Sequence, residues 1–114
     1  SKVRKAQIDI DNARIGYEDA YKGMQAQYVN ALNDLDNNRR NYTKQKDNYA
    51  LADDVYKVTT DRYREGIVSM TEVLQDEIQL SSAQNNYLTA SYNYKVSNLA
   101  LLKLTGKLST LLAQ

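Results

Sequence analysis

The sequence predicts an all-α chain that folds as one long antiparallel coiled-coil hairpin. Three observations predict this fold: the 114 residues contain no proline and only four glycines, a side-chain pattern repeats every seven residues, and one strong break separates residues 62 and 74. Without proline and with few glycines, the chain lacks the usual signals of strands and turns, so long helices are favoured. A seven-residue period that persists over many turns indicates supercoiling against another helix.

The first predicted helix spans residues 3–64 and would be about 90 Å long at 1.5 Å per residue. One of its positions recurs every seven residues and is almost always tyrosine; this tyrosine row comprises Tyr21, Tyr28, Leu35, Tyr42, Tyr49, Tyr56 and Tyr63. Three residues after each of the first six comes a mostly small or polar side chain, and this companion row comprises Met24, Ala31, Asn38, Gln45, Ala52 and Thr59. A second stripe lies on another face and comprises Leu51, Val55, Val58 and Arg62. Two stripes on one helix indicate two neighbouring helices.

The break between the helices carries the signals of a short, shaped turn. Gly66 supplies the left-handed position that commonly ends a helix. Ser69 and Glu72 match a capping box that opens the next helix, and Val68 and Val73 stand at the positions of a hydrophobic staple. We therefore predict a tight hairpin tip between two long helices.

The second predicted helix spans residues 70–105 and would be about 54 Å long at 1.5 Å per residue. Its apolar residues recur at spacings of three and four, and Gly106 is the predicted residue that follows its end. Folding the chain about Gly66 places Thr105 beside Tyr28, so earlier residues have no partner within the hairpin. Such a hairpin buries little apolar surface of its own. We therefore expect neighbours outside this chain to cover the residues that have no partner within it. The chain opens without methionine. We interpret residues 1–114 as one piece of a larger protein, a fragment of an α-helical barrel.

Composition excludes several classes of function. Fifteen basic and fourteen acidic residues give a net charge of +1, which argues against nucleic acid or an anionic membrane surface as a partner. The chain has neither histidine nor cysteine, and its adjacent carboxylate pairs do not converge on one spot of a helix. We therefore expect no enzymatic activity, no cofactor and no metal site. The sequence has no apolar run of about 18 residues, so it predicts no membrane-spanning helix in this stretch.

The chain resembles the periplasmic helical region of TolC-like outer-membrane efflux proteins. The resemblance rests on R-Y-x-x-G from Arg62 to Gly66, S-x-x-E-V-L from Ser69 to Leu74, AQNNYLTASYNY at residues 83–94 and L-L-x-L-T-G-x-L at residues 101–108. It covers nearly the whole chain, and the order and separation of these motifs make it fairly specific.

The resemblance implies a homotrimeric tunnel that runs from an outer-membrane β-barrel through the periplasm of a Gram-negative bacterium. Its walls would be coiled-coil hairpins whose tips meet a periplasmic adaptor protein, which is linked to an inner-membrane pump. This chain would be the periplasmic portion, and contact with the membrane would be made only by parts that it lacks.

The same resemblance implies roles for residues near the tip. The adaptor-docking residues would be Glu65, Gly66 and Ile67. The residues that narrow the tunnel would be Tyr63, Glu72 and Gln75. The chain departs from the family at two positions: Gln75 would form a neutral ring, and Val68 stands where some relatives have a latch arginine.

An alternative hypothesis is a coiled-coil interaction module without a transport pathway, such as the hairpin of an adaptor protein or a scaffold that dimerises through the tyrosine row. The second stripe discriminates between these hypotheses, because a tunnel wall needs neighbours on both sides and a simple hairpin needs only one. Strands and a second hairpin in flanking sequence would favour the channel, and two halves of a lipoyl-like domain would favour the adaptor.

Overall fold

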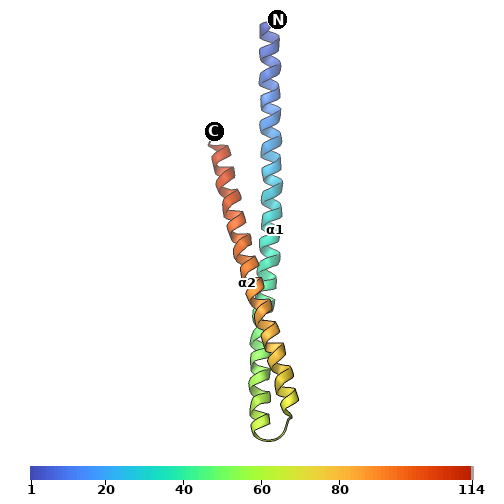
Figure 1. The fold of residues 1–114 in the computed structure, drawn as a ribbon. Coiled ribbons are helices and arrows are strands. Elements are labelled where there is room, and N and C mark those ends of the chain that lie inside the picture. The colour runs from blue at the N-terminus through green and yellow to red at the C-terminus, as the bar shows by residue number, and fades with distance from the viewer. Residues whose placement is uncertain (114) are drawn as a thin grey trace.

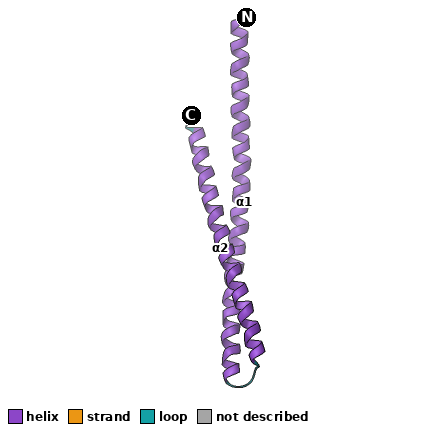
Figure 2. Cartoon of the chain, in the orientation of Figure 1, coloured by secondary structure: helices purple, strands orange, loops and turns teal. Residues whose placement is uncertain are grey.

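The computed structural model describes residues 1–113 as two long helices joined by one short turn (Figures 1 and 2). Helix α1 spans Lys2–Arg64 and helix α2 spans Met70–Leu112, and no strand occurs in this part of the chain. The molecule measures 96 × 20 × 13 Å, and its radius of gyration is 26.2 Å. A compact domain of this length would have a radius of gyration of about 13 Å. The predicted helical hairpin is therefore confirmed.

The two helices pack along the rows that the sequence predicts. Every member of the tyrosine row except Tyr63 is at least partly buried, and so is every member of the companion row. Helix α2 packs against them with two rows of side chains that also repeat every seven residues. The first row comprises Val73, Leu80, Tyr87, Tyr94, Leu101 and Leu108, and the second comprises Asp76, Ala83, Ala90, Ser97, Leu104 and Leu111; all twelve side chains are partly or fully buried.

The resulting core is thin. Only Ala31, Val73, Ala90 and Ser97 are buried among the described residues, and three of these four have small side chains. No large side chain is fully enclosed in the described part of the chain. Because buried apolar area is the main favourable contribution to folding, this hairpin draws little stability from its own core.

Helix α2 continues past the end that the sequence predicts. The prediction that Gly106 follows the last residue of this helix was wrong, because α2 runs seven residues beyond Thr105 to Leu112. Gly106 is not in the left-handed conformation, which only Gly66 adopts among the glycines. Instead, Thr110 Oγ1 donates a hydrogen bond to the Gly106 carbonyl at 3.0 Å, and Leu108 and Leu111 continue the buried rows.

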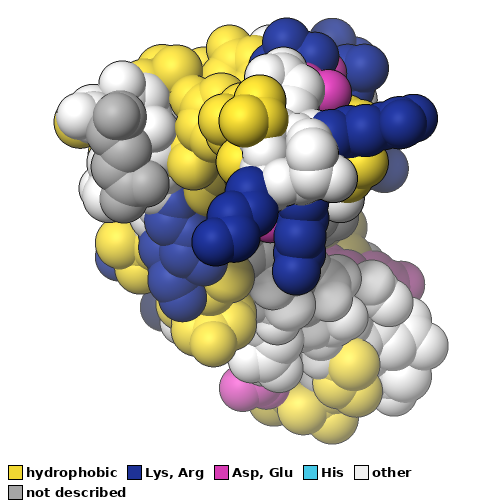
Figure 3. All heavy atoms as spheres, turned by 90° about the horizontal axis from the view of Figure 1, so that it is seen from above, with side chains coloured by type: hydrophobic (Ala, Val, Ile, Leu, Met, Phe, Trp, Pro, Cys, Tyr) yellow, Lys and Arg dark blue, Asp and Glu magenta, His cyan; other side chains and the backbone are white. Residues whose placement is uncertain are grey.

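The N-terminal part of α1 extends beyond the end of α2 (Figure 1). Residues 1–20 are all exposed except Asp11, and they include Val3, Ile10 and Tyr17, which prolong the companion row at seven-residue spacing. Seen along the long axis, hydrophobic side chains lie at the surface among lysine and arginine side chains (Figure 3). The hairpin thus leaves the extension of its own seam uncovered.

Candidate functional site

The tip of the hairpin, residues 65–69, is where the predicted docking residues lie, and hydrogen bonds of the backbone define its shape. The Ile67 N–H donates to the Arg62 carbonyl at 2.9 Å, and the Gly66 N–H donates to the Tyr63 carbonyl at 3.0 Å. These two bonds form a Schellman motif, with Gly66 at a φ of 76°. A φ in this range disfavours any side chain, so the turn depends on glycine here.

Helix α2 then begins at Ser69, whose side chain caps it. Ser69 has extended backbone angles, φ −82° and ψ 161°, and its Oγ accepts a hydrogen bond from the Glu72 N–H at 3.4 Å. Within residues 1–113 no hydrogen bond returns from the Glu72 side chain to the Ser69 backbone, so the structure contains one half of the capping box. Glu72 still lies in the first turn of α2, where a negative charge suits the helix dipole.

The three predicted docking residues lie together on the outside of the turn. Glu65, Gly66 and Ile67 are all exposed, and the Ile67 side chain is 66% exposed. A Cβ atom added to Gly66 would meet nothing within 4 Å. An apolar side chain beside a bare backbone position gives the tip a small surface that another protein could contact closely.

The predicted constriction residues are placed around the tip rather than gathered at one point. Tyr63 ends the tyrosine row and is 40% exposed. Glu72 and Gln75 are exposed on the first turns of α2. In the described chain no hydrogen bond links any two of these three side chains, so a narrow ring would require side chains from neighbouring molecules.

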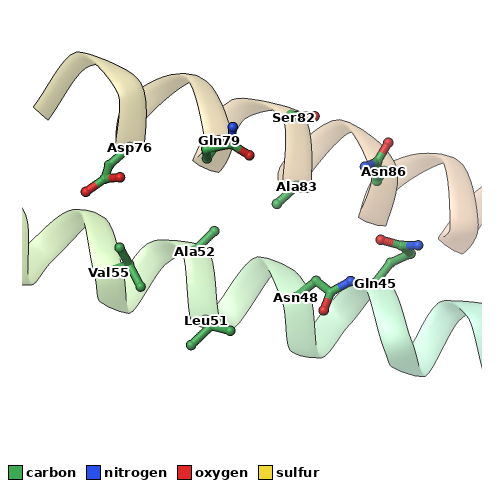
Figure 4. Close-up of a pocket in the computed structure, with 10 residues that line it drawn as sticks. All are labelled: Gln45, Asn48, Leu51, Ala52, Val55, Asp76, Gln79, Ser82, Ala83 and Asn86. Carbon is green, nitrogen blue, oxygen red and sulfur yellow. The ribbon is translucent and has the colours of Figure 1, made fainter. Parts of the chain in front are cut away.

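The second stripe borders an open groove between the helices. Leu51 and Val55 line it on α1, and Gln79 and Asn86 line it on α2, in a space of about 380 Å³. Figure 4 shows Ala52 pointing across the groove and Leu51 pointing away from α2. Leu51 is 64% exposed and Val58 is 50% exposed, so α2 does not cover the second stripe.

A cluster of tyrosines lies halfway along the seam. The Tyr42 ring packs against Tyr87 and Tyr94, with ring centroids 5.5 and 5.3 Å apart, and Tyr49 stacks on Tyr87 at 5.8 Å. The Tyr42 and Tyr87 hydroxyl oxygens are 3.3 Å apart and share a hydrogen bond. This hydrogen bond, followed by the partial burial of the phenol, raises the pKa of Tyr87 above its ordinary value.

Sequence reasoning missed the neighbouring contact between Asn38 and Ser97. The Asn38 side-chain amide donates a hydrogen bond to Ser97 Oγ, across 59 residues of sequence. Asn38 stands out in the sequence as a polar member of the companion row, whereas Ser97 was not singled out from the sequence. The signal that could have found it is the spacing of Ala83, Ala90 and Ser97, which places a hydroxyl in a row of alanines.

Potential metal ligands do not gather in the part of the chain that the structure describes. No group of three or more potential metal ligands occurs within residues 1–113. Neither helix in this part of the chain combines the length and hydropathy that crossing a membrane requires. The five ion pairs of the described chain all lie within α1 on exposed or partly exposed side chains, where such pairs contribute little.

Comparison with known proteins gives one match. A family model described as "Outer membrane efflux protein" matches residues 1–107. Neither the curated proteins nor the solved structures gave a significant match. The family match covers the tip, the seam and the uncovered extension of α1 together.

Proposed function

We propose that this chain, which belongs to the outer membrane efflux protein family, forms one helical hairpin in the wall of a trimeric tunnel in the periplasm. The family match favours an efflux component over an interaction module without a transport pathway. The family is one of efflux proteins rather than of enzymes. In this proposal, the chain is the periplasmic part of an outer-membrane protein.

The observation that carries this proposal is the exposed, tightly built tip at the end of a rod 96 Å long. The hairpin has a thin core and two sets of apolar side chains that it does not cover: the second stripe and the extension of α1. Side-by-side packing of several hairpins would bury both sets. A homotrimeric wall thus supplies the contacts that the single hairpin lacks.

The tip would meet a periplasmic adaptor, through which the channel reaches an inner-membrane pump. Glu65, Gly66 and Ile67 form the proposed docking surface, supported by the exposure of Ile67 and by the open space around the Gly66 Cα. Tyr63, Glu72 and Gln75 would narrow the tunnel just behind it. Their separate positions on one hairpin suit a ring that several hairpins complete.

Photo-crosslinking in the complete channel tests the docking proposal. A photoreactive amino acid at Ile67 should give a crosslink to the adaptor in cells that contain the assembled system. The matched control is Leu99, which is also 66% exposed but lies far from the tip on α2. A crosslink of equal yield from Leu99, or none from Ile67, would contradict docking at the tip.

A further inference from the structure

Only two side-chain hydrogen bonds join α1 to α2 in residues 1–113, and they lie at neighbouring levels of the seam. One links the Tyr42 and Tyr87 hydroxyls, and the other runs from the Asn38 amide to Ser97 Oγ. No ion pair of the described chain crosses between the helices. Directional contacts between the helices are therefore confined to the middle of the hairpin.

The Asn38 and Ser97 contact is a satisfied polar pair inside the seam. Ser97 is 8% exposed, and its Oγ donates to the Asn93 carbonyl at 3.0 Å. Because this donation uses the hydroxyl proton, the oxygen lone pairs are free to accept the Asn38 amide. No buried side-chain polar atom of the described residues lacks a partner. The pair is thus complete only when these two residues face one another.

The rest of the seam discriminates poorly between registers. Both helices repeat every seven residues, so a slide of one heptad again sets the tyrosine row against apolar side chains. Tyr42 lies between Tyr87 and Tyr94 in this register, and a slide of one heptad would place it between Tyr94 and Leu101 or between Leu80 and Tyr87, which are again large side chains.

A slide by one heptad would break the polar pair in either direction. It would set Asn38 against Ala90 or against Leu104, seven residues to either side of Ser97. Neither side chain can accept a hydrogen bond, so the partly buried Asn38 amide would lose its partner without gaining full access to water. The tip fixes the alignment near residues 65–69, and the polar pair lies far along the seam from it.

We propose that Asn38 and Ser97 hold the register of α1 against α2 in the middle of the seam, far from the alignment that the tip fixes, while the other side chains of the rows make contacts that several registers share. In coiled coils a single asparagine in the seam can select one alignment of the helices, and Asn38 occupies such a position in partly buried form. This inference goes beyond the proposed function and does not depend on it.

Engineered disulfides in the full 114-residue chain report the register, because the chain has no cysteine of its own. Ala83→Cys is combined in turn with a cysteine at residue 45, 52 or 59, which are seven residues apart in the companion row. Ala52 and Ala83 line the same groove and lie each fourteen residues from the polar pair, so this combination reports the native register. The other two combinations report slides of one heptad in opposite directions.

The disulfides are allowed to equilibrate in a glutathione buffer, and their yields are compared by mass spectrometry. With Asn38 present, the combination of residues 52 and 83 should dominate. Asn38→Leu should raise the yield of at least one shifted disulfide, in the monomer or in a dimer, by about tenfold, which corresponds to about 1.4 kcal/mol. Thermal unfolding of Asn38→Leu should occur at an unchanged or higher temperature, whereas loss of a merely stabilising contact would lower it.

Two further variants make the result decisive. Tyr42→Phe removes the other hydrogen bond between the helices but keeps the ring, and it should leave the native register unchanged. The double variant Asn38→Ser, Ser97→Asn should again give mainly the native disulfide, because it rebuilds the polar pair with the two side chains exchanged. The proposal is overturned if Asn38→Leu gives only the native disulfide, if Tyr42→Phe shifts the register equally, or if the exchange fails to restore it.

Discussion

Gly66 is the residue on which the reversal of the chain depends. Its φ of 76° ends α1, and a Cβ atom there would meet nothing within 4 Å. The hairpin itself therefore restricts this position only through backbone conformation. Any further demand for a bare backbone must come from a partner at the tip.

Substitutions at Gly66 separate these two demands. Gly66→Leu should lower the free energy of unfolding by about 1 to 2 kcal/mol, the cost of a left-handed conformation for an L-residue, with helicity nearly unchanged. In the complete channel it should also abolish export. Helicity is measured by circular dichroism, and export by the efflux of a substrate of the complete channel from cells.

Gly66→Asn is the matched variant, because asparagine tolerates the left-handed conformation far better. If close approach of an adaptor to the backbone matters, Gly66→Asn should also impair export despite its near-normal stability. Normal export by Gly66→Leu would show that the docking assignment is wrong.

Ionisation of Tyr87 makes the stability of the hairpin depend on pH in the alkaline range. Its pKa in the folded state is raised above the ordinary value of 10, first by the hydrogen bond to Tyr42. The folded state therefore favours the neutral phenol, so its contribution to stability is present below pH 10. That contribution is lost as the pH rises through the folded pKa.

We expect a site-specific carbon NMR titration to place the pKa of Tyr87 above 10. Tyr42→Phe removes the main cause of the shift and should return the Tyr87 pKa toward the value of a free tyrosine. An unchanged Tyr87 pKa in that variant would show that the hydroxyl contact does not govern the titration.

At the scale of an element, the last turns of α2 show how packing extends a helix that local signals would end. Gly106 and the preceding threonine suggest a helix end, yet α2 runs to Leu112. Leu108 lies beside Tyr21 and Tyr28 in one hollow of the surface. The apolar contacts of this row outweigh the modest helix penalty of one glycine, about 1 kcal/mol.

Leu108→Ala tests whether these turns contribute to the hairpin. Because Leu108 is only partly buried, we expect the substitution to lower the free energy of unfolding by about 1 to 2 kcal/mol, below the range for fully buried leucines. Leu102→Ala is the control, since Leu102 is 67% exposed and should change stability by less than about 0.5 kcal/mol. Equal effects in urea unfolding would show that α2 does not pack beyond Thr105.

At the scale of the whole molecule, the hairpin presents a solvated face and faces that lack a neighbour. The ion pairs of Asp36 with Arg39 and Arg40, at 2.9 and 3.1 Å, mark an exposed charged surface of α1. The second stripe, in contrast, exposes Leu51, Val55 and Val58. Assembly into a wall would cover the second stripe and leave the charged surface in water.

Val58→Asp should therefore act on assembly rather than on folding. In the isolated chain we expect a change in unfolding free energy within about 0.5 kcal/mol, since Val58 is 50% exposed. In the complete channel a charge at this position would be buried between hairpins and should prevent formation of the proposed trimer, which native mass spectrometry measures. Ala50→Asp places the same charge at an exposed position outside the second stripe and should leave the trimer intact; loss of the trimer in both variants would contradict the assignment.

Sequence by itself determined the features of this protein that depend on neighbouring residues. The tyrosine and companion rows identified the buried face of α1, and Gly66 with Ser69 located the turn, because heptad periodicity and capping are local properties. The tip residues were proposed from family resemblance, and their docking role stays a prediction. Only the tertiary structure decided that α2 passes Gly106 and that Asn38 meets Ser97. Both depend on contacts between residues far apart in the chain, whose packing and hydrogen bonds no local pattern specifies.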